Sequence, residues 1–350
     1  MNTTQKYIMT IVVAGVLVVS GIAVYTFVYG KQQSDGIQYI SVVSANGTRQ
    51  TIDLNLSNSY LIRPANYTGN TFSFSAPINR IVSLAPSITS TLYGIGSIGK
   101  VVGVDAFSDY PPNLNVTVMT YDSGYAINDE LIAYARPQLV IAPGDGYFAS
   151  NQENTIANTF HIPFLLMSPN SVQQIENETI ELGQITGNSA NATNVSTWMQ
   201  SSMTVFSTHL ANVTSYLKAF YYLSAPGVWT AGEGTFINQF FSIAHLVNIA
   251  NGTGYYQESL ENITVADPQV IFLDEYVNGS YISGEPFDST SAVTNGKVFT
   301  LYNDDVFSEP DFRVIYAIGW MISQVYPQNF NVSNIPQFPV SLQYQPGSGI

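Results

Sequence analysis

One short phrase occurs twice in this chain, and it constrains the fold more than any other feature. The first copy, residues 130–141, reads ELIAYARPQLVI, and the second, residues 261–272, reads ENITVADPQVIF. Each has a glutamate, six residues, Pro-Gln and an apolar run, which predicts a short helix, a proline stop and a buried strand. The copies lie too far apart for a solenoid repeat. We therefore expect two similar α/β lobes, each with a glutamate at the start of an equivalent helix.

The beginning of the chain predicts a membrane anchor. Residues 7–30 carry no charged side chain and are flanked by Lys6 and Lys31. A stretch of this length suffices to cross a hydrocarbon core of about 30 Å, whereas the apolar region of a secretory signal is shorter. We expect an uncleaved N-terminal transmembrane helix, and hence a single-pass protein of the cell membrane whose soluble domain is extracellular.

Glycosylation signals support the extracellular assignment. Asn-x-Ser/Thr triplets are spread over most of the chain, as expected for a glycosylated exterior domain. They begin at Asn46, Asn55, Asn66, Asn115, Asn177, Asn191, Asn194, Asn212, Asn251, Asn262, Asn278 and Asn331. The chain has no cysteine, which excludes disulfides, cysteine metal sites and a thiol nucleophile.

The charge balance restricts the partners and the habitat. Lys and Arg number 10 against 24 Asp and Glu, giving a net charge of −14, whereas a nucleic-acid-binding protein needs a basic surface. Only 10% of the residues are charged, so neutral polar groups keep the surface hydrated when carboxylates are protonated. We therefore hypothesise an acidic habitat, an idea that unfolding near pH 3 would contradict.

The alternation of strand and helix patterns predicts an α/β fold with parallel sheets. Asn46-Gly47 lies between two alternating segments and predicts a hairpin, and residues 170–218 have the composition of one long helix. The expected segments are a transmembrane anchor at 1–33, a β-hairpin extension at 34–78, an N-terminal α/β lobe at 79–169, a linker helix at 170–218, a C-terminal α/β lobe at 219–326 and a loose tail at 327–350.

Several stretches, in the same order, resemble one family: the helical-backbone (class III) substrate-binding proteins of ABC importers for vitamin B12, haem and ferric siderophores. They are RIVSLAPSITSTLYGIGSIGKVVGV at 80–104, FSDYPP at 107–112, the two repeated phrases, TAGEGTF at 230–236 and AVTNGKVF at 292–299. The resemblance covers roughly residues 79–326. It implies two α/β lobes that are joined by one long helix and move little when ligand binds.

The resemblance implies a docking role for Glu130 and Glu261. In this family one exposed glutamate per lobe engages arginines on the two permease subunits, so the expected partners are an ABC permease dimer and its ATPase. A glutamate in a first helical turn also complements the helix dipole, but its presence in both copies favours docking. Asn262 begins a sequon beside Glu261, and we expect it to be unmodified because a glycan there would obstruct docking.

The resemblance also places the ligand between the lobes, at the carboxyl ends of the strands. Its B12-binding members imply aromatic contacts, and flat rings suit a corrin, a porphyrin or an aromatic chelate. The implied contacts are Phe107, Tyr121, Trp229 and Tyr255, while Tyr147 and Phe307 follow nearby strand ends and could join them. Arg313 follows a polar loop and has a role in either ligand contact or helix capping.

The sequence leaves the ligand open among cobalamin-like compounds, ferric siderophores and haem. The scarcity of Lys and Arg disfavours anionic siderophores. None of His161, His209 and His245 has a partner at metal-ligand spacing, which disfavours haem and a metal site.

An enzyme is not expected, nor is a cofactor. No Walker lysine follows a glycine-rich turn and no Gly-x-Ser-x-Gly elbow is present. The pairs Asp304-Asp305 and Asp274-Glu275 are interpreted as solvated loop charges. The alternative function is a cell-envelope or adhesion protein that uses the same fold without transport.

Overall fold

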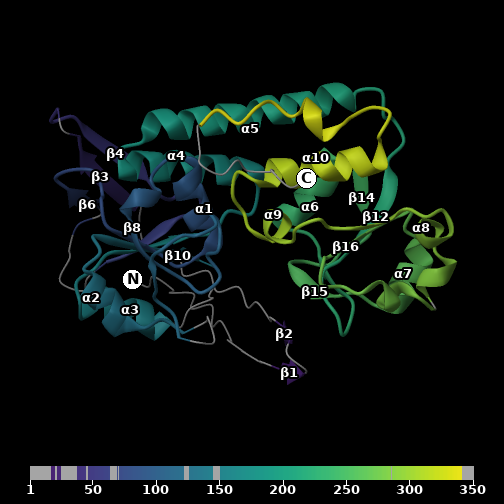
Figure 1. Cartoon of the computed structure of the whole chain (residues 1–350), viewed down its shortest axis with the longest axis horizontal. Helices are drawn as coiled ribbons and strands as arrows, with labels where there is room; N and C mark the ends of the chain where they lie inside the picture. The colour runs from purple at the N-terminus through teal and green to yellow at the C-terminus, as the bar shows by residue number, and fades with distance from the viewer. Residues whose placement is uncertain are drawn as a thin grey trace, which may run out of the picture.

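The computed structural model describes residues 17–19, 22–24, 38–44, 46–63, 69, 71–121, 126–144, 150–284 and 286–340. Two α/β lobes lie next to each other, and one long helix, α5 (Ser189–His209), extends over both of them (Figure 1).

The N-terminal lobe is built on a six-stranded sheet in the order β5-β11-β10-β7-β8-β9. Its strands are β5 (Tyr60–Ile62), β7 (Ile81–Ser83), β8 (Val101–Val104), β9 (Thr117–Val118), β10 (Leu139–Pro143) and β11 (Phe164–Met167). All neighbours are parallel except β5 and β11. The helices are α1 (Pro86–Gly94), η1 (Ile98–Lys100), α2 (Asp129–Ala135) and α3 (Ser150–Asn158). Apolar residues fill both faces of the sheet, which explains the continuous apolar run of β10.

The C-terminal lobe has a parallel four-stranded sheet in the order β14-β12-β16-β17. These strands are β12 (Leu217–Tyr222), β14 (Leu246–Asn248), β16 (Val270–Leu273) and β17 (Val298–Thr300), and a separate antiparallel pair joins β13 (Trp229–Ala231) to β15 (Tyr255–Gln257). The helices are α6 (Phe236–Ile243), α7 (Leu260–Ala266), η2 (Gly279–Ile282), η3 (Phe287–Ser289), α8 (Ser291–Thr294), α9 (Asp305–Ser308) and α10 (Val314–Val325). Two apolar clusters lie on opposite faces of this sheet, so both lobes are three-layered.

The hairpin expected around Asn46-Gly47 is present. Strands β3 (Tyr39–Val43) and β4 (Arg49–Asp53) pair antiparallel, and Gly47 adopts a φ of +82° in the turn. A third strand, β6 (Thr71–Phe74), pairs parallel with β3. This sheet contributes buried residues such as Ile40 to the same core as the N-terminal lobe.

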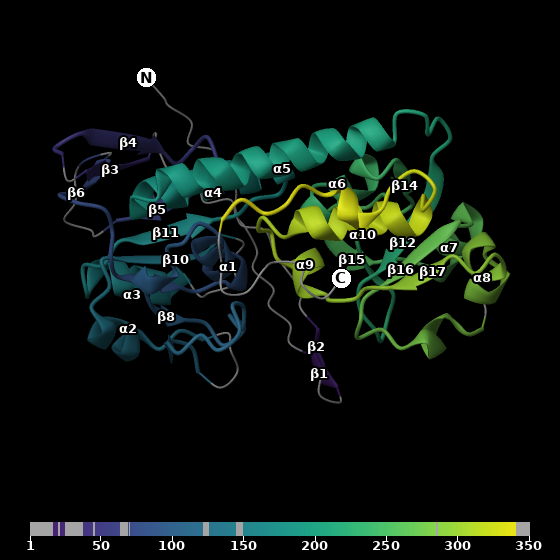
Figure 2. The same cartoon turned by 45° about the horizontal axis from the view of Figure 1, so that its top comes forward.

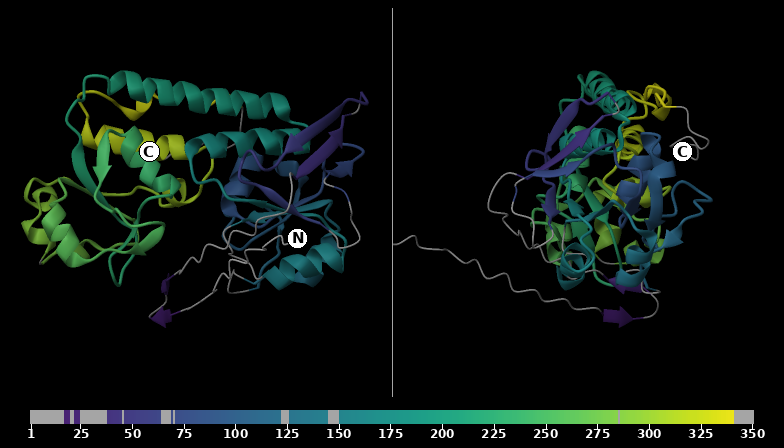
Figure 3. Two further views of the ribbon diagram at one scale, coloured as in Figure 1. Left: turned by 180° about the vertical axis from the view of Figure 1, so that it is seen from behind. Right: turned by 90° about the vertical axis from the view of Figure 1, so that its left-hand side faces the viewer.

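The sequence predicts one long helix over residues 170–218, but the structure has two helices there. Helix α4 (Val172–Thr186) ends at Gly187, whose φ of +76° is a left-handed C-cap, and α5 begins two residues later. The two helices pack closely, since a Cβ at Gly183 would lie 2.2 Å from the Cβ of Ala192. Helix α5 extends over both lobes (Figure 2, Figure 3). The break before it follows from the Gly187-Asn188 pair, a helix stop that the composition of the segment does not reveal.

The expectation of a loose tail after Pro327 is wrong for residues 327–340. Phe330 and Phe338 are buried, and the Trp198 indole of α5 donates a hydrogen bond of 2.7 Å to the Pro336 carbonyl. A short helix, η4 (Val332–Asn334), lies between the two phenylalanines. The segment therefore covers the contact between α5 and α10, whereas residues 341–350 lie outside the described part.

Little of the predicted transmembrane helix falls within the described residues. The exceptions are β1 (Leu17–Val19) and β2 (Ile22–Val24), which pair as short antiparallel strands rather than helix. Among the described residues, no helix combines the length and the hydropathy that crossing a membrane requires.

Candidate functional site

The two copies of the repeated phrase fold into the same unit. In each, a capping side chain accepts a hydrogen bond of 3.0 Å from the backbone N–H of the third helical residue. Asn128 caps α2 in this way, and Ser259 caps α7. Each helix ends at a residue with a φ of 48°, Arg136 in one copy and Asp267 in the other. The strand that follows, β10 or β16, lies inside its sheet. The prediction of equivalent helices with a glutamate in the first turn is confirmed.

A cation and a glutamine hold each unit against the neighbouring strand. In the first copy the Arg80 guanidinium donates to the carbonyls of Ala135 and Arg136, at the end of α2. In the second copy the Lys218 ammonium donates to the carbonyl of Ala266, at the end of α7, over 2.8 Å. Cations at a helix C-terminus also complement the helix dipole.

The glutamine of each Pro-Gln pair has the same structural role. The Gln138 side-chain oxygen accepts from the backbone N–H of Arg80 at 3.2 Å, and that of Gln269 accepts from the N–H of Lys218 at 3.1 Å. Both glutamines also donate their backbone N–H to the carbonyl of that same residue, over 2.8 Å. These contacts explain why Gln follows Pro in both phrases, a role that the sequence alone did not reveal.

Glu130 and Glu261 are both exposed, one in each lobe. Helices α2 and α7 lie on the side of their sheets away from α5 (Figure 1). The Asn262 amide donates to the Glu258 carboxylate at 3.0 Å, so this side chain is engaged within the protein.

The predicted aromatic contacts separate into two groups. Phe107 and Tyr121, which follow β8 and β9, have exposed side chains. Trp229 and Tyr255 lie on the paired strands β13 and β15 and are half-buried. The Trp229 indole N–H is buried and has no acceptor among the described residues, and Tyr147 lies outside them.

A buried carboxylate fixes the loop that carries Phe107. Asp105 accepts hydrogen bonds from the Phe107 backbone N–H, at 2.8 Å, and from the Ser108 hydroxyl. Burial raises the pKa of Asp105, and the hydrogen bond from Ser108 partly opposes this rise. The buried Asp105 carboxylate therefore helps to fix the backbone of this loop.

Phe307 and Arg313 are not placed for direct ligand contact. Phe307 is only 2% exposed and packs against Trp320 with ring centroids 5.7 Å apart. Arg313 is 3% exposed, and its guanidinium pairs with Asp311 and Glu309. In the sequence Phe307 follows a strand end and Arg313 follows a polar loop, but both side chains are buried in the folded protein.

The Arg313 cluster joins the two lobes. The Ser90 hydroxyl on α1 donates to the Asp311 carboxylate, and the Arg313 guanidinium carbon lies 4.4 Å from the centre of the Tyr110 ring. The Phe312 ring packs directly on Gly94, because a Cβ atom at position 94 would lie 2.3 Å from that ring. Sequence analysis did not identify this junction, because its members come from distant parts of the chain.

Carboxylates from both lobes gather near this junction. The interpretation of Asp304 and Asp305 as solvated charges is wrong, because both are half-buried, and Asp274 is buried. Burial, together with a hydrogen bond to Glu275, raises the pKa of Asp304 to about 8. Burial also raises the pKa of Asp305, with a further contribution from Asp109 of the other lobe.

Two of the three histidines, His209 and His245, pack against other parts of the chain. The His209 ring nitrogen lies 2.6 Å from the Asn329 carbonyl, and the His245 ring stacks on Tyr216 with centroids 4.6 Å apart. Within the described part of the chain, no group of three or more His, Asp or Glu side chains could hold a metal ion.

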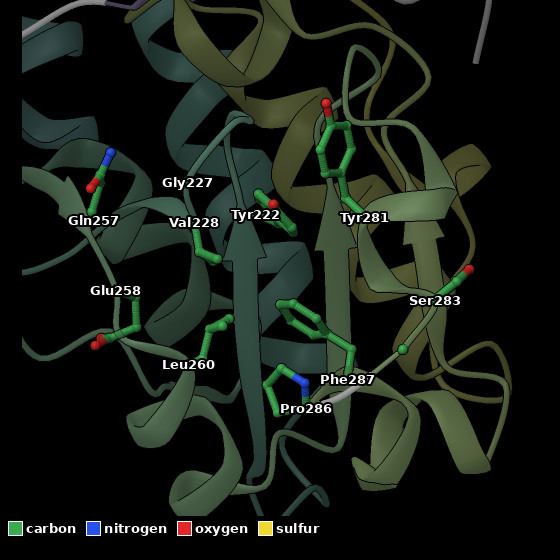
Figure 4. A pocket seen from close by; sticks show the side chains of 11 residues that line it. Tyr222, Gly227, Val228, Gln257, Glu258, Leu260, Tyr281, Ser283, Pro286 and Phe287 are labelled. Carbon is green, nitrogen blue, oxygen red and sulfur yellow. The ribbon is translucent and has the colours of Figure 1, made fainter.

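One cavity of about 360 Å³ lies within the C-terminal lobe, beside the start of α7. Its walls include the stacked rings of Tyr222 and Phe287, with centroids 5.8 Å apart, and the side chains of Leu260 and Tyr281 (Figure 4). Trp229 and Tyr255 do not line it. All of its lining residues belong to the C-terminal lobe, so it is not a space between the lobes.

Comparison with known proteins identifies clear relatives. The family model described as "Periplasmic binding protein" matches residues 81–304. The vitamin B12-binding protein of Vibrio cholerae is 28% identical over 247 residues, which cover 69% of this chain and 87% of the relative. The cobalamin-binding protein of Halobacterium salinarum is 25% identical over 292 residues, covering 78% and 76% respectively.

Solved structures have the same fold. The periplasmic vitamin B12-binding protein BtuF of Vibrio cholerae aligns with a TM-score of 0.61 at 26% identity, covering 71% of this chain and 97% of that chain. The periplasmic haem-binding protein BhuT in complex with two hemes aligns with a TM-score of 0.63 at 14% identity, covering 73% and 99%, a likeness of fold alone.

Proposed function

Because the chain belongs to the periplasmic binding protein family, whose members bind solutes and are not enzymes, we propose that it captures a corrinoid or a similar chelate and delivers it to an ABC permease. The ligand would lie between the two lobes, at the carboxyl ends of their strands. Delivery would need no chemistry in this chain, since the partner ATPase supplies the energy.

One observation carries the delivery step: the duplicated unit with an exposed glutamate. Glu130 and Glu261 occupy the same position in two units. Each unit has its own N-cap side chain, its own glutamine and its own cation at equivalent places. A protein that only adheres to the cell envelope has no need of two such matched units. A receptor for a permease dimer does, because its partner presents the same surface twice.

Cobalamin is the ligand that we favour, with an iron chelate as the second choice. Both curated relatives above bind cobalamin according to their names. The aromatic side chains of Phe107, Tyr121, Trp229 and Tyr255 are large and rigid and suit a flat macrocycle. Tyr147 remains a prediction, and we leave Phe307 and Arg313 out of the contact set.

Replacing Trp229 tests the ligand site. Trp229→Ala is expected to weaken cyanocobalamin binding more than ~5-fold, which corresponds to about 1 kcal/mol, the scale of a buried aromatic contact. The measurement is a calorimetric titration. Tyr216→Ala is the matched control, because Tyr216 is an exposed aromatic residue. It lies just before β12, at the amino end of this strand, whereas the proposed ligand site is at the carboxyl ends of the strands. Equal affinity of the Trp229 variant and the native chain would move the ligand site elsewhere.

We also propose that the apolar segment at residues 7–30 holds the receptor at the membrane, with the lobes outside the cell. Its support is the absence of charge over the whole segment. Fractionation of cells that express the full chain tests this, and recovery of the protein in the soluble fraction would contradict it.

A further inference from the structure

Each docking glutamate has an exposed apolar side chain four residues after it. Tyr134 follows Glu130 at this spacing and is 86% exposed, and Val265 follows Glu261 and is 79% exposed. These are the two most exposed large hydrophobic side chains among the described residues. Single exposed apolar residues are common, but here the same position of both units has one.

The orientation of the two helices explains the exposure. Residues four apart lie on the same face of a helix, one turn from each other. Ile132 in α2 and Ile263 in α7, which stand between the glutamate and the apolar residue, are 0% exposed and face the lobe core. The glutamate and the apolar residue of each unit therefore project outward together.

We propose that each docking glutamate is one half of a two-residue contact with a permease subunit. The carboxylate of Glu130 or Glu261 pairs with a cation, and the side chain of Tyr134 or Val265 is buried against an apolar patch beside that cation. This inference rests on the proposed function and adds the residues that remove water from the ion pair.

The occupant is a two-fold protein dimer for two reasons. The pair of side chains occurs once in each lobe, so the complementary surface must also occur twice. The chain has a net charge of −14 and each pair contains a carboxylate, so an anionic lipid surface would be repelled. A subunit with an arginine or lysine next to apolar residues satisfies both halves of the contact, and burial of the apolar half strengthens the ion pair.

The apolar residue differs between the two units, so the two substitutions are expected to weaken docking by different amounts. Tyr134 has more apolar area to bury than Val265. Tyr134→Ser is expected to weaken docking ~10-fold, and Val265→Ser ~3-fold, as apolar area buried at an interface predicts.

The test uses the full chain and the permease–ATPase complex encoded with it, reconstituted in nanodiscs. Biolayer interferometry measures docking of the Tyr134→Ser/Val265→Ser double variant, and calorimetry measures its affinity for cyanocobalamin. Leu56→Ser/Tyr216→Ser is the matched control, since its residues are 77% and 47% exposed and lie outside the two units. We expect the double variant to lose at least ~10-fold in docking affinity while its ligand affinity and the control stay unchanged.

A Glu130→Ala/Glu261→Ala variant separates this inference from the proposed function. If it fails to dock while the Tyr134/Val265 variant docks like the native chain, the apolar half of the contact does not exist and the receptor function stands. If neither variant loses docking, the receptor function fails as well. A loss of cyanocobalamin affinity in the Tyr134/Val265 variant would assign this surface to the ligand site and overturn the inference.

Discussion

Arg313→Met is expected to lower the free energy of unfolding by about 3–5 kcal/mol, because it leaves buried carboxylates without their cation. Asp311 is 0% exposed and accepts hydrogen bonds of 3.1 and 3.0 Å from the Arg313 Nε–H. Glu309 accepts from the same guanidinium. Burial alone would lower the pKa of Arg313, but the charges of Asp311 and Glu309 outweigh it and raise the pKa, so the guanidinium stays charged.

The loss should extend to the contact between the lobes. Asp311 accepts from Ser90 of the N-terminal lobe, and the Arg313 guanidinium lies over the ring of Tyr110. Urea unfolding measures the effect, with Lys297→Met as the control cation of the same lobe. Arg313→Met/Asp311→Asn should recover part of the stability, since it removes one of the stranded charges. A change within 1 kcal/mol for Arg313→Met would show that the cluster is not a stabilising ion pair.

The protein is expected to be more stable at pH 4 than at pH 8. Burial raises the pKa of Glu181 from its usual 4.5 to about 8, and burial together with Glu181 raises the pKa of Glu178 well above its usual value. Both lie in α4 beneath the turn after β4, where Ser59 donates to Glu181 at 3.2 Å and Ser57 donates to it as well.

The direction of the pH effect follows from the two states. Below about pH 4.5 the carboxyls are protonated in the folded and the unfolded chain, so the stability is fully present. Between pH 4.5 and about 8 the unfolded chain loses these protons and the folded chain keeps them, so the stability falls. Each pH unit costs up to ~1.4 kcal/mol per group, or on the order of 4 kcal/mol for Glu181 over this window.

Glu181→Gln should remove much of this loss, because glutamine resembles the protonated carboxyl. Chemical denaturation at pH 4 and pH 8 measures it, with the exposed Glu233→Gln as control. The Glu181 variant is expected to match the native chain at pH 4 and to exceed it at pH 8. If the native chain is equally stable at both pH values, the buried carboxyls are not protonated at neutral pH and this account of them is wrong.

The parts of the fold that sequence predicted are those set by local chemistry. The Pro-Gln phrase contains its own helix, stop and strand, so both copies were located with their glutamates. The turn at Asn46-Gly47 specifies its hairpin in the same way. The break at Gly187 is also local, but it depends on a single C-cap residue that the overall composition of residues 170–218 does not reveal.

The parts that sequence did not predict depend on distant partners. Arg313 looked available for ligand, but its surroundings come from α1, from the loop after β8 and from the segment before α10. Asp304 looked solvated for the same reason. The tail packs because Trp198 and its neighbours offer an apolar surface that no local pattern reveals.

Calorimetric titration of cyanocobalamin, haem and a ferric siderophore into the full chain determines whether the protein is a receptor for such a solute. We expect saturable binding of cyanocobalamin at micromolar affinity or better, and we expect Trp229→Ala to weaken it. Absence of binding to all three ligands, by protein that is folded at pH 4 and at pH 7, would contradict the receptor function and favour a cell-envelope role for this fold.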